Sequence, residues 1–162
     1  MTDYITKAEF YMGAALLAAQ RSKDPKTKVG SCIVDPDGVI LSTGYNGFPT
    51  GISDTFGNWS KEPDTFGAIK HDYVVHSEIN AILNASGKSL KGATIYTTLF
   101  PCKECAKAII QAGIKKVVYL NETDTERFMT DFSRLLFSET GVTLEEFQVD
   151  SKRSKIVLNF FD

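Results

Sequence analysis

The sequence has little cysteine and histidine, no strong excess of charge and no long apolar run. Its 162 residues include three Cys and two His. An odd, small cysteine count is a poor basis for a disulfide framework and favours a reducing compartment, so we expect a cytoplasmic protein. No apolar run approaches the roughly 20 residues that a membrane span needs, and the first residues lack the apolar core of a secretory signal.

The low net charge argues against a binding partner that is held mainly by electrostatic attraction. The formal net charge is −2, so no global basic field attracts nucleic acid or an acidic membrane surface. Apolar residues make up 43% of the chain, close to the globular norm. We find no repeat or linker, and the length fits a single domain over residues 1–162.

The chain alternates between helical segments and β-branched strands. Helices are predicted over residues 7–21, 77–86, 102–111 and 125–140, and strands over 29–34, 39–45, 93–99, 116–120 and 155–161. Strand–helix–strand order implies right-handed crossovers and parallel strand pairs. We therefore predict an α/β fold, a three-layer α/β/α arrangement with a mixed five-stranded sheet.

Local signals support several of these elements. Thr6 with Glu9 matches a capping box at the first helix. The turn chemistry of 35–38 predicts a hairpin between the first two strands. Residues 46–73 contain several Gly and Pro and the only Trp, and so long a connection is usually a functional loop or a lid.

One histidine and two cysteines stand out by their spacing. His76 is followed two residues later by Glu78, and Pro101 precedes Cys102 and Cys105. The set supplies three zinc ligands and one carboxylate with no evident place on the metal. Three protein ligands leave a position for water, which is typical of a catalytic zinc site. The spacing also matches the signature of zinc nucleobase deaminases.

The spacing also predicts where the metal lies. His76 and Glu78 are two residues apart and cannot share a helix face, so the site must lie beyond the helix N-terminus. Cys102 and Cys105 can share a face at the start of their own helix. The positive ends of both helices would then favour deprotonated thiols. Glu78 would take a proton from water and deliver it to a leaving amine.

A purely structural zinc site needs a fourth ligand. Cys32 and His71 are the remaining candidates. Cys32 lies within an apolar strand, where we expect a buried, inert thiol. We interpret His71 as an ordinary surface or loop histidine. Glu78 would also have no use in a structural site.

The chain resembles the deoxycytidylate (dCMP) deaminases, a branch of the cytidine deaminase-like superfamily, from about Tyr11 to Asp162. The matching stretches are Ala18–Pro25, Gly44–Pro49, His76–Ile82 and Leu99–Lys107. The resemblance implies a cytidine deaminase-like fold and hydrolysis of dCMP to dUMP, which supplies thymidylate synthesis. It also implies a homohexamer that dCTP with Mg²⁺ activates and dTTP inhibits.

By this resemblance His76, Cys102 and Cys105 bind zinc and Glu78 shuttles the proton. Most members carry Ala where this chain has Ser77, whose backbone N–H would face the pyrimidine. Some phage members hold a second zinc with a Glu two residues before the ligand histidine. Here that position is Val74, so we expect one zinc per chain.

The resemblance also implies contacts to the nucleotide. Asn46 would hold the sugar 3′-hydroxyl, although Asn-Gly alone is also a hairpin-turn signal. The backbone carbonyl of Phe100 would accept from the exocyclic amine, while its side chain is core or pocket wall. Arg21, Ser22 and Lys23 would bind the regulatory triphosphate, unless these charges simply belong to a solvated helix end.

The sequence is also compatible with other functions. The motif sets the chemistry and not the phosphate count, so dCTP or deoxycytidine could be the substrate. A tRNA or single-stranded DNA editing deaminase is disfavoured by the low net charge and the lack of a basic stripe. An alternative from another class is a non-catalytic nucleotide-binding zinc module.

Overall fold

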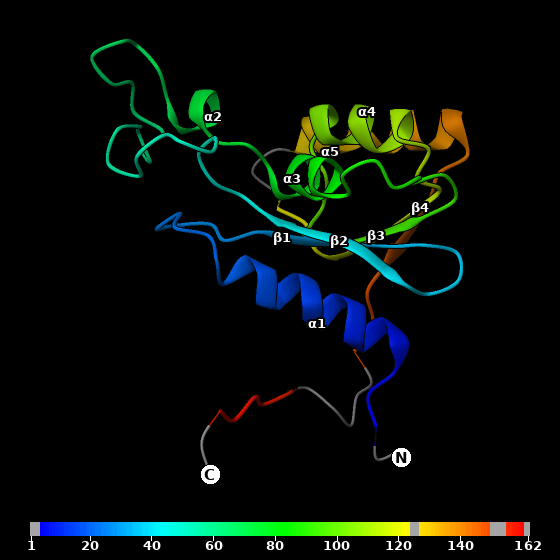
Figure 1. The fold of residues 1–162 in the computed structure, drawn as a ribbon. Helices are drawn as coiled ribbons and strands as arrows, with labels where there is room; N and C mark the ends of the chain where they lie inside the picture. The colour runs from blue at the N-terminus through cyan, green and yellow to red at the C-terminus, as the bar shows by residue number, and fades with distance from the viewer. Residues whose placement is uncertain (1–3, 124–126, 150–154, 161–162) are drawn as a thin grey trace.

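The computed structural model describes residues 4–123, 127–149 and 155–160. One mixed sheet has helices on both faces (Figure 1), as the sequence predicted. The strands are β1 Gly30–Val34, β2 Ile40–Tyr45, β3 Thr94–Leu99, β4 Lys116–Asn121 and β5 Thr143–Glu146. The helices are α1 Lys7–Ala19, α2 Lys70–Tyr73, α3 Ser77–Asn84, α4 Lys103–Gln111 and α5 Arg127–Thr140.

The five strands lie in the order β2-β1-β3-β4-β5. β1 pairs antiparallel with both β2 and β3, whereas β3, β4 and β5 are mutually parallel neighbours. The predicted hairpin therefore forms β1 and β2, and α4 and α5 are the crossovers between the parallel strands. Parallel strands end at the same edge of a sheet, where α/β proteins place their ligands.

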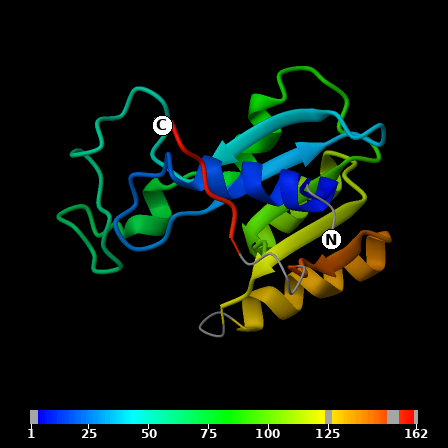
Figure 2. The same cartoon turned by 90° about the horizontal axis from the view of Figure 1, so that it is seen from below.

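The two faces of the sheet carry separate cores. α1 covers one face, and α3, α4 and α5 cover the other (Figures 1 and 2). On the α1 face, Tyr11, Met12 and Ala15 pack on Cys32 and Val34. The larger core lies on the opposite face and includes Ile33, Ile95, Ile109 and Phe137, all with no exposed surface.

A row of side chains on and after α3 covers the free edge of β2. An unpaired strand edge presents backbone groups that invite aggregation unless something covers them. Side chains at intervals of four residues, a helical repeat, donate to alternate carbonyls of this strand. The contacts are Asn80 to Tyr45 (2.8 Å), Asn84 to Thr43 (2.9 Å) and Lys88 to Leu41 (3.0 Å). They hold α3 along β2 and so fix the position of its N-terminus.

The predicted late strand is wrong. Residues 155–160 form no regular element and are exposed, and residue 161 lies outside the described residues. Thr143–Glu146 instead pairs in parallel with β4. Its composition is less apolar, but it directly follows α5, so a short crossover brings it to the sheet edge.

Other element boundaries shift by small amounts. The capping box of Thr6 and Glu9 is present. α1 ends at Ala19 rather than at residue 21, because Gln20 is its C-cap. The helix predicted from residue 125 is described from Arg127, and residues 125 and 126 lie outside the described part of the chain. In the described ranges no helix has the length and apolar character to cross a bilayer.

Candidate active site

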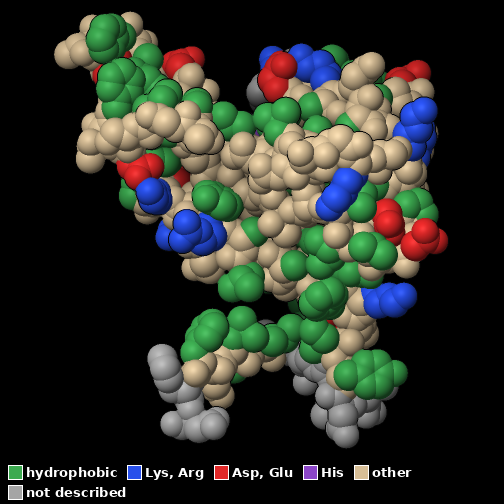
Figure 3. All heavy atoms as spheres, in the orientation of Figure 1, with side chains coloured by type: hydrophobic (Ala, Val, Ile, Leu, Met, Phe, Trp, Pro, Cys, Tyr) green, Lys and Arg blue, Asp and Glu red, His purple; other side chains and the backbone are tan. Residues whose placement is uncertain are grey.

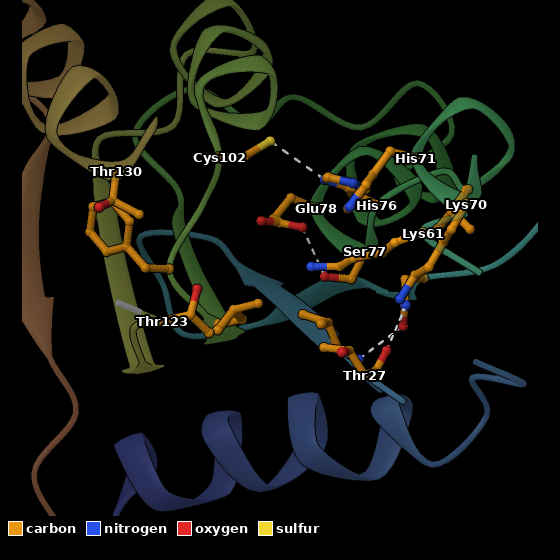
Figure 4. Close-up of a pocket in the computed structure, with 15 residues that line it drawn as sticks. Thr27, Lys61, Lys70, His71, His76, Ser77, Glu78, Cys102, Thr123 and Thr130 are labelled. Atoms are coloured by element: carbon orange, nitrogen blue, oxygen red, sulfur yellow. Dashed lines mark hydrogen bonds between the residues drawn. The ribbon is translucent and has the colours of Figure 1, made fainter. Parts of the chain in front are cut away.

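Three predicted ligands meet where two helices begin. His76 is the N-cap of α3, Cys102 is the N-cap of α4, and Cys105 lies in the first turn of α4. Nδ1 of His76 lies 3.4 Å from Sγ of each cysteine. Figure 4 shows His76 and Cys102 facing each other across this point. The site lies beyond the helix N-termini, as the spacing predicted.

The distances between these atoms fit a zinc ion. Tetrahedral bonds of about 2.3 Å to sulfur and about 2.0 Å to nitrogen place the two ligand atoms roughly 3.5 Å apart. The ligand atoms of the three residues all lie within 4.8 Å of one another. In the part of the chain that the structure describes, no other group of His, Cys, Asp and Glu meets this criterion. This is a zinc-binding His/Cys/Cys site.

Metal binding would release a proton from the pair of cysteines. The hydrogen bond from the Cys105 thiol lowers the pKa of Cys102 to about 3. The same bond raises the pKa of Cys105, so the pair shares one proton that a divalent cation would replace. Cys32 differs, because it is fully buried in β1 and burial raises its pKa to about 12. The prediction that this thiol is buried is confirmed.

Glu78 lies beside the ligands without belonging to them. It is 4% exposed, in the first turn of α3, and Figure 4 shows its carboxylate in the pocket near Cys102 and His76. Burial raises its pKa above the ordinary value. The Ser77 hydroxyl donates to Oε2 of Glu78 at 2.9 Å and also lies 2.8 Å from Oγ of Ser31. The sequence predicts a role for the Ser77 backbone N–H but gives no signal for this hydroxyl contact.

A glycine in β2 allows α3 to approach the sheet. A Cβ atom on Gly44 would lie 2.3 Å from the backbone nitrogen of Ala81 and 2.3 Å from the carbonyl oxygen of Ser77. Real Cβ atoms do not approach backbone atoms so closely, so any larger residue would displace the helix. Gly44 therefore helps to set where Ser77 and Glu78 lie.

Asn46 and Phe100 both line the pocket around the zinc site. Asn46 is 5% exposed. The Phe100 side chain is both pocket wall and core, and its ring packs edge-on against Tyr119 with centroids 4.8 Å apart. Arg134 lies over the same ring at 4.4 Å. The nucleotide contacts predicted for Asn46 and for the Phe100 carbonyl remain predictions.

Arg21, Ser22 and Lys23 are not part of the pocket lining. Ser22 is buried, and its hydroxyl accepts from the backbone N–H of Asp24 at 3.3 Å. Lys23 forms an ion pair with Asp54. Asp24, the acidic residue that follows, is buried and pairs with the more distant Lys70. The structure thus separates this segment from the zinc site.

The long connection over residues 46–73 contributes nitrogen-bearing side chains to the pocket that no sequence motif predicted. Lys61, Lys70 and His71 line the pocket. Figure 4 places all three on one side of the zinc ligands, opposite Thr123 and Thr130. The ring centroids of His71 and His76 are 6.5 Å apart, so His71, which is an exposed surface residue as expected, also borders the pocket. No spacing signal distinguished it, because its place depends on how the whole connection folds back.

Comparison with known proteins gives one consistent result. Residues 5–121 match the family model described as the cytidine and deoxycytidylate deaminase zinc-binding region. The chain is 45% identical over 158 residues to deoxycytidylate deaminase of Mus musculus and 44% identical to that of Homo sapiens. Each alignment covers 98% of this chain and 88% of the relative. The crystal structure of dCMP deaminase from cyanophage S-TIM5 with dCMP and dUMP matches with a TM-score of 0.70 and 35% identity. That match covers 86% of this chain and 95% of the phage chain.

Proposed function

The chain belongs to the cytidine and deoxycytidylate deaminase family, and we propose that it hydrolyses dCMP to dUMP and ammonia. The observation that carries the proposal is a buried carboxylate, Glu78, beside a zinc site with only three protein ligands. Three ligands leave a position for the water that hydrolysis consumes. The similarity to dCMP deaminases over nearly the full chain supports the choice of substrate.

Each of several pocket residues has a separate role in the reaction. Zinc, when bound, supplies the Lewis acid that makes water reactive at neutral pH. Glu78 is placed to take a proton from a water molecule as the water oxygen bonds to C4 of the cytosine, and to deliver that proton to the amine, which leaves C4 as ammonia. The Ser77 hydroxyl holds the Glu78 carboxylate in place. The backbone N–H of Ser77 and the backbone carbonyl of Phe100 bind the polar edge of the pyrimidine.

The remaining pocket residues suit the sugar and the phosphate. Asn46 contacts the deoxyribose 3′-hydroxyl. Lys61 lines the pocket, and among the described residues its ammonium group has no acidic partner within salt-bridge distance. A lysine supplies a point charge for a phosphate. This favours a nucleotide over the free nucleoside deoxycytidine.

A substrate panel tests this proposal. Purified protein is incubated separately with dCMP, CMP, dCTP and deoxycytidine, and loss of cytosine absorbance is followed. We expect dCMP to be the best substrate, with deoxyribose preferred over ribose. Faster turnover of dCTP or deoxycytidine would move the proposal to that compound. No turnover of any of the four by zinc-loaded protein would contradict a catalytic role.

We also propose regulation and assembly of the kind that the resemblance implies. dCTP with Mg²⁺ would activate and dTTP inhibit through Arg21, Ser22 and Lys23, with one zinc ion per chain in a cytoplasmic homohexamer. The apolar surface of α1 supports self-association, since Phe10 and Leu17 are more than half exposed. In Figure 3 hydrophobic side chains also gather along the C-terminal segment on the underside of the molecule. Analytical ultracentrifugation would give the number of chains.

A further inference from the structure

Asp24 is a fully buried carboxylate just beyond α1, and the proposed reaction gives it no role. Its Oδ1 accepts from the backbone N–H groups of Lys26 at 2.9 Å and Thr27 at 3.0 Å. Its Oδ2 accepts from the ammonium group of Lys70 and from Nδ2 of Asn46 at 3.4 Å. An ionised carboxylate has about four acceptor positions, so these contacts occupy them all.

Those contacts fix the orientation of the Asn46 amide. Nδ2 faces two pure acceptors, the Asp24 carboxylate and the backbone carbonyl of Thr27 at 2.9 Å. Oδ1 accepts from the backbone N–H of Val29 at 2.9 Å. A flipped amide would set acceptor against acceptor and donor against donor. Both Nδ2 hydrogens are therefore used, and Asn46 has only one lone pair of Oδ1 left for a ligand.

Lys70 keeps the carboxylate in the state that this arrangement needs. Burial raises the pKa of Asp24, but Lys70 and the backbone N–H groups lower it by more, so the carboxyl stays ionised. The Lys70 side chain is itself 10% exposed, and a buried ammonium group needs a partner of opposite charge. Its backbone N–H donates to the carbonyl of Ser60 at 2.8 Å. The ion pair thus ties the segment after α1 to the connection that forms the pocket wall.

We propose that Asp24, together with Lys70, is a positioning residue that presents Asn46 to the pocket purely as a hydrogen-bond acceptor. The site then selects nucleotides whose sugar carries a hydrogen-bond donor at the position facing Asn46. This inference rests on the proposed function, in which Asn46 contacts the 3′-hydroxyl of dCMP. It assigns the direction of that bond and the residue that sets it.

Unmodified protein tests the direction of the bond. The kcat/KM for dCMP is compared with that for the 3′-deoxy, 3′-fluoro and 3′-amino analogues of the same monophosphate. The 3′-deoxy and 3′-fluoro compounds cannot donate, so we expect each to lose at least about 10-fold, the scale for a buried polar group left unpaired. The 3′-amino compound can donate and should lose less. Equal rates for the fluoro and amino compounds would overturn the proposal.

Variants test the role of Asp24. Asp24→Asn puts an amide where Asn46 needs a carboxylate. We therefore expect the ratio of kcat/KM for dCMP to kcat/KM for its 3′-deoxy analogue to fall toward one. The change should come mainly from a higher KM for dCMP. Asp24→Asn removes the charge partner of Lys70, which destabilises the fold, so Asp24→Asn/Lys70→Met is measured as well. Replacing both members of a buried ion pair is often neutral for stability.

A matched control separates positioning from general damage. Asp35 also accepts two backbone N–H groups, in the β1–β2 turn away from the pocket. Asp35→Asn should keep the full preference for the 3′-hydroxyl. If the folded, zinc-loaded double variant kept that preference, or lost both substrates equally, Asp24 would not be a positioning residue. Failure of the unmodified protein to deaminate dCMP would instead contradict the proposed function.

Discussion

Glu78 and Ser77 illustrate how single residues prepare this site. A buried carboxylate is costly unless it is hydrogen bonded, and the Ser77 hydroxyl supplies such a bond at 2.9 Å. Ser31 backs that hydroxyl from the neighbouring strand. The carboxylate therefore has a defined place beside the metal ligands, which general acid–base catalysis requires.

Asp24 should give the protein a measurable dependence of stability on pH. Burial raises its pKa, but Lys70 and backbone N–H groups outweigh this, so the folded-state pKa lies below the ordinary 3.8. A depressed pKa contributes stability that is complete above about pH 5 and is lost as the pH falls through the folded-state value. As the pH falls, we expect the free energy of unfolding of the wild type to decrease more than that of Asp24→Asn/Lys70→Met.

Urea denaturation of both proteins between about pH 6 and about pH 3 measures this difference. Loss of zinc in acid affects both proteins and cancels in the comparison. Asp35→Asn provides a control for removing a carboxylate elsewhere. A stability difference that stayed constant across the range would show that Asp24 has the same pKa in the folded and unfolded states.

At the scale of elements, polar side chains hold α3 against β2, and a glycine in β2 that has no side chain leaves room for the helix. Asn80 and Asn84 bind carbonyls of the strand, and Gly44 leaves room for the backbone of the helix. Because His76 and Glu78 lie at the start of α3, packing along the strand decides where the chemistry takes place.

Gly44→Ala should damage both stability and activity. The added Cβ would lie 2.3 Å from two backbone atoms, and overpacking of this kind costs about 1–3 kcal/mol. We also expect deamination of dCMP to fall at least about 10-fold, since displacing a catalytic group by about 1 Å can cost roughly 10²-fold. Thermal unfolding and steady-state rates are the measurements.

Gly13→Ala is the control for this substitution. A Cβ at Gly13 meets nothing within 4 Å, and alanine favours a helix over glycine. This variant should be at least as stable as the wild type. If Gly44→Ala behaved like Gly13→Ala, the close packing of α3 on β2 would not control the site.

The elements that were predicted correctly depend on local chemistry. Thr6 and Glu9 mark a helix start through bonds to nearby backbone, and the spacing of Cys102 and Cys105 sets their shared face. The misplaced strand shows the limit of such patterns. Residues 155–160 have the right composition, but which segment fills the edge of β4 depends on the length of the preceding crossover.

The same limit explains the residues that were missed at the site. Zinc ligands and Glu78 are recognised by residue type and spacing alone. Lys70 and His71 enter the pocket because the connection between β2 and α3 folds back on itself, with Gly47 bridged to Val75. The partner of Asp24 likewise lies 46 positions away along the chain. Contacts of this range leave no local signature.

For the whole molecule, the arrangement of layers brings distant segments to one pocket. Its lining extends in sequence from Thr27 to Thr130. α1 covers the opposite face of the sheet from α3 and α4 (Figure 1), and the segment after α1 reaches the pocket wall through the Asp24–Lys70 pair. An effector bound near the end of α1 would therefore have a direct structural connection to the substrate.

We expect one double variant to lose both its activation by dCTP and its inhibition by dTTP. Arg21→Ala with Lys23→Ala removes two cations that suit a triphosphate, so activation by dCTP and inhibition by dTTP should both weaken while turnover at saturating dCMP changes little. Steady-state rates against dCMP, with and without each effector, measure this. Lys107→Ala, which removes a cation that lies on α4 and is paired with Glu104, is the control. A double variant that responds like the wild type would place the effector site elsewhere.

The most direct test of the account compares the wild type with Glu78→Gln, both purified and assayed for zinc content and for conversion of dCMP to dUMP. We expect the wild type to form dUMP, and Glu78→Gln to keep its zinc but to lose at least about 10²-fold in rate, the scale of general acid–base catalysis. A zinc-loaded wild type that forms no dUMP, or a variant that retains most of the rate, would contradict it.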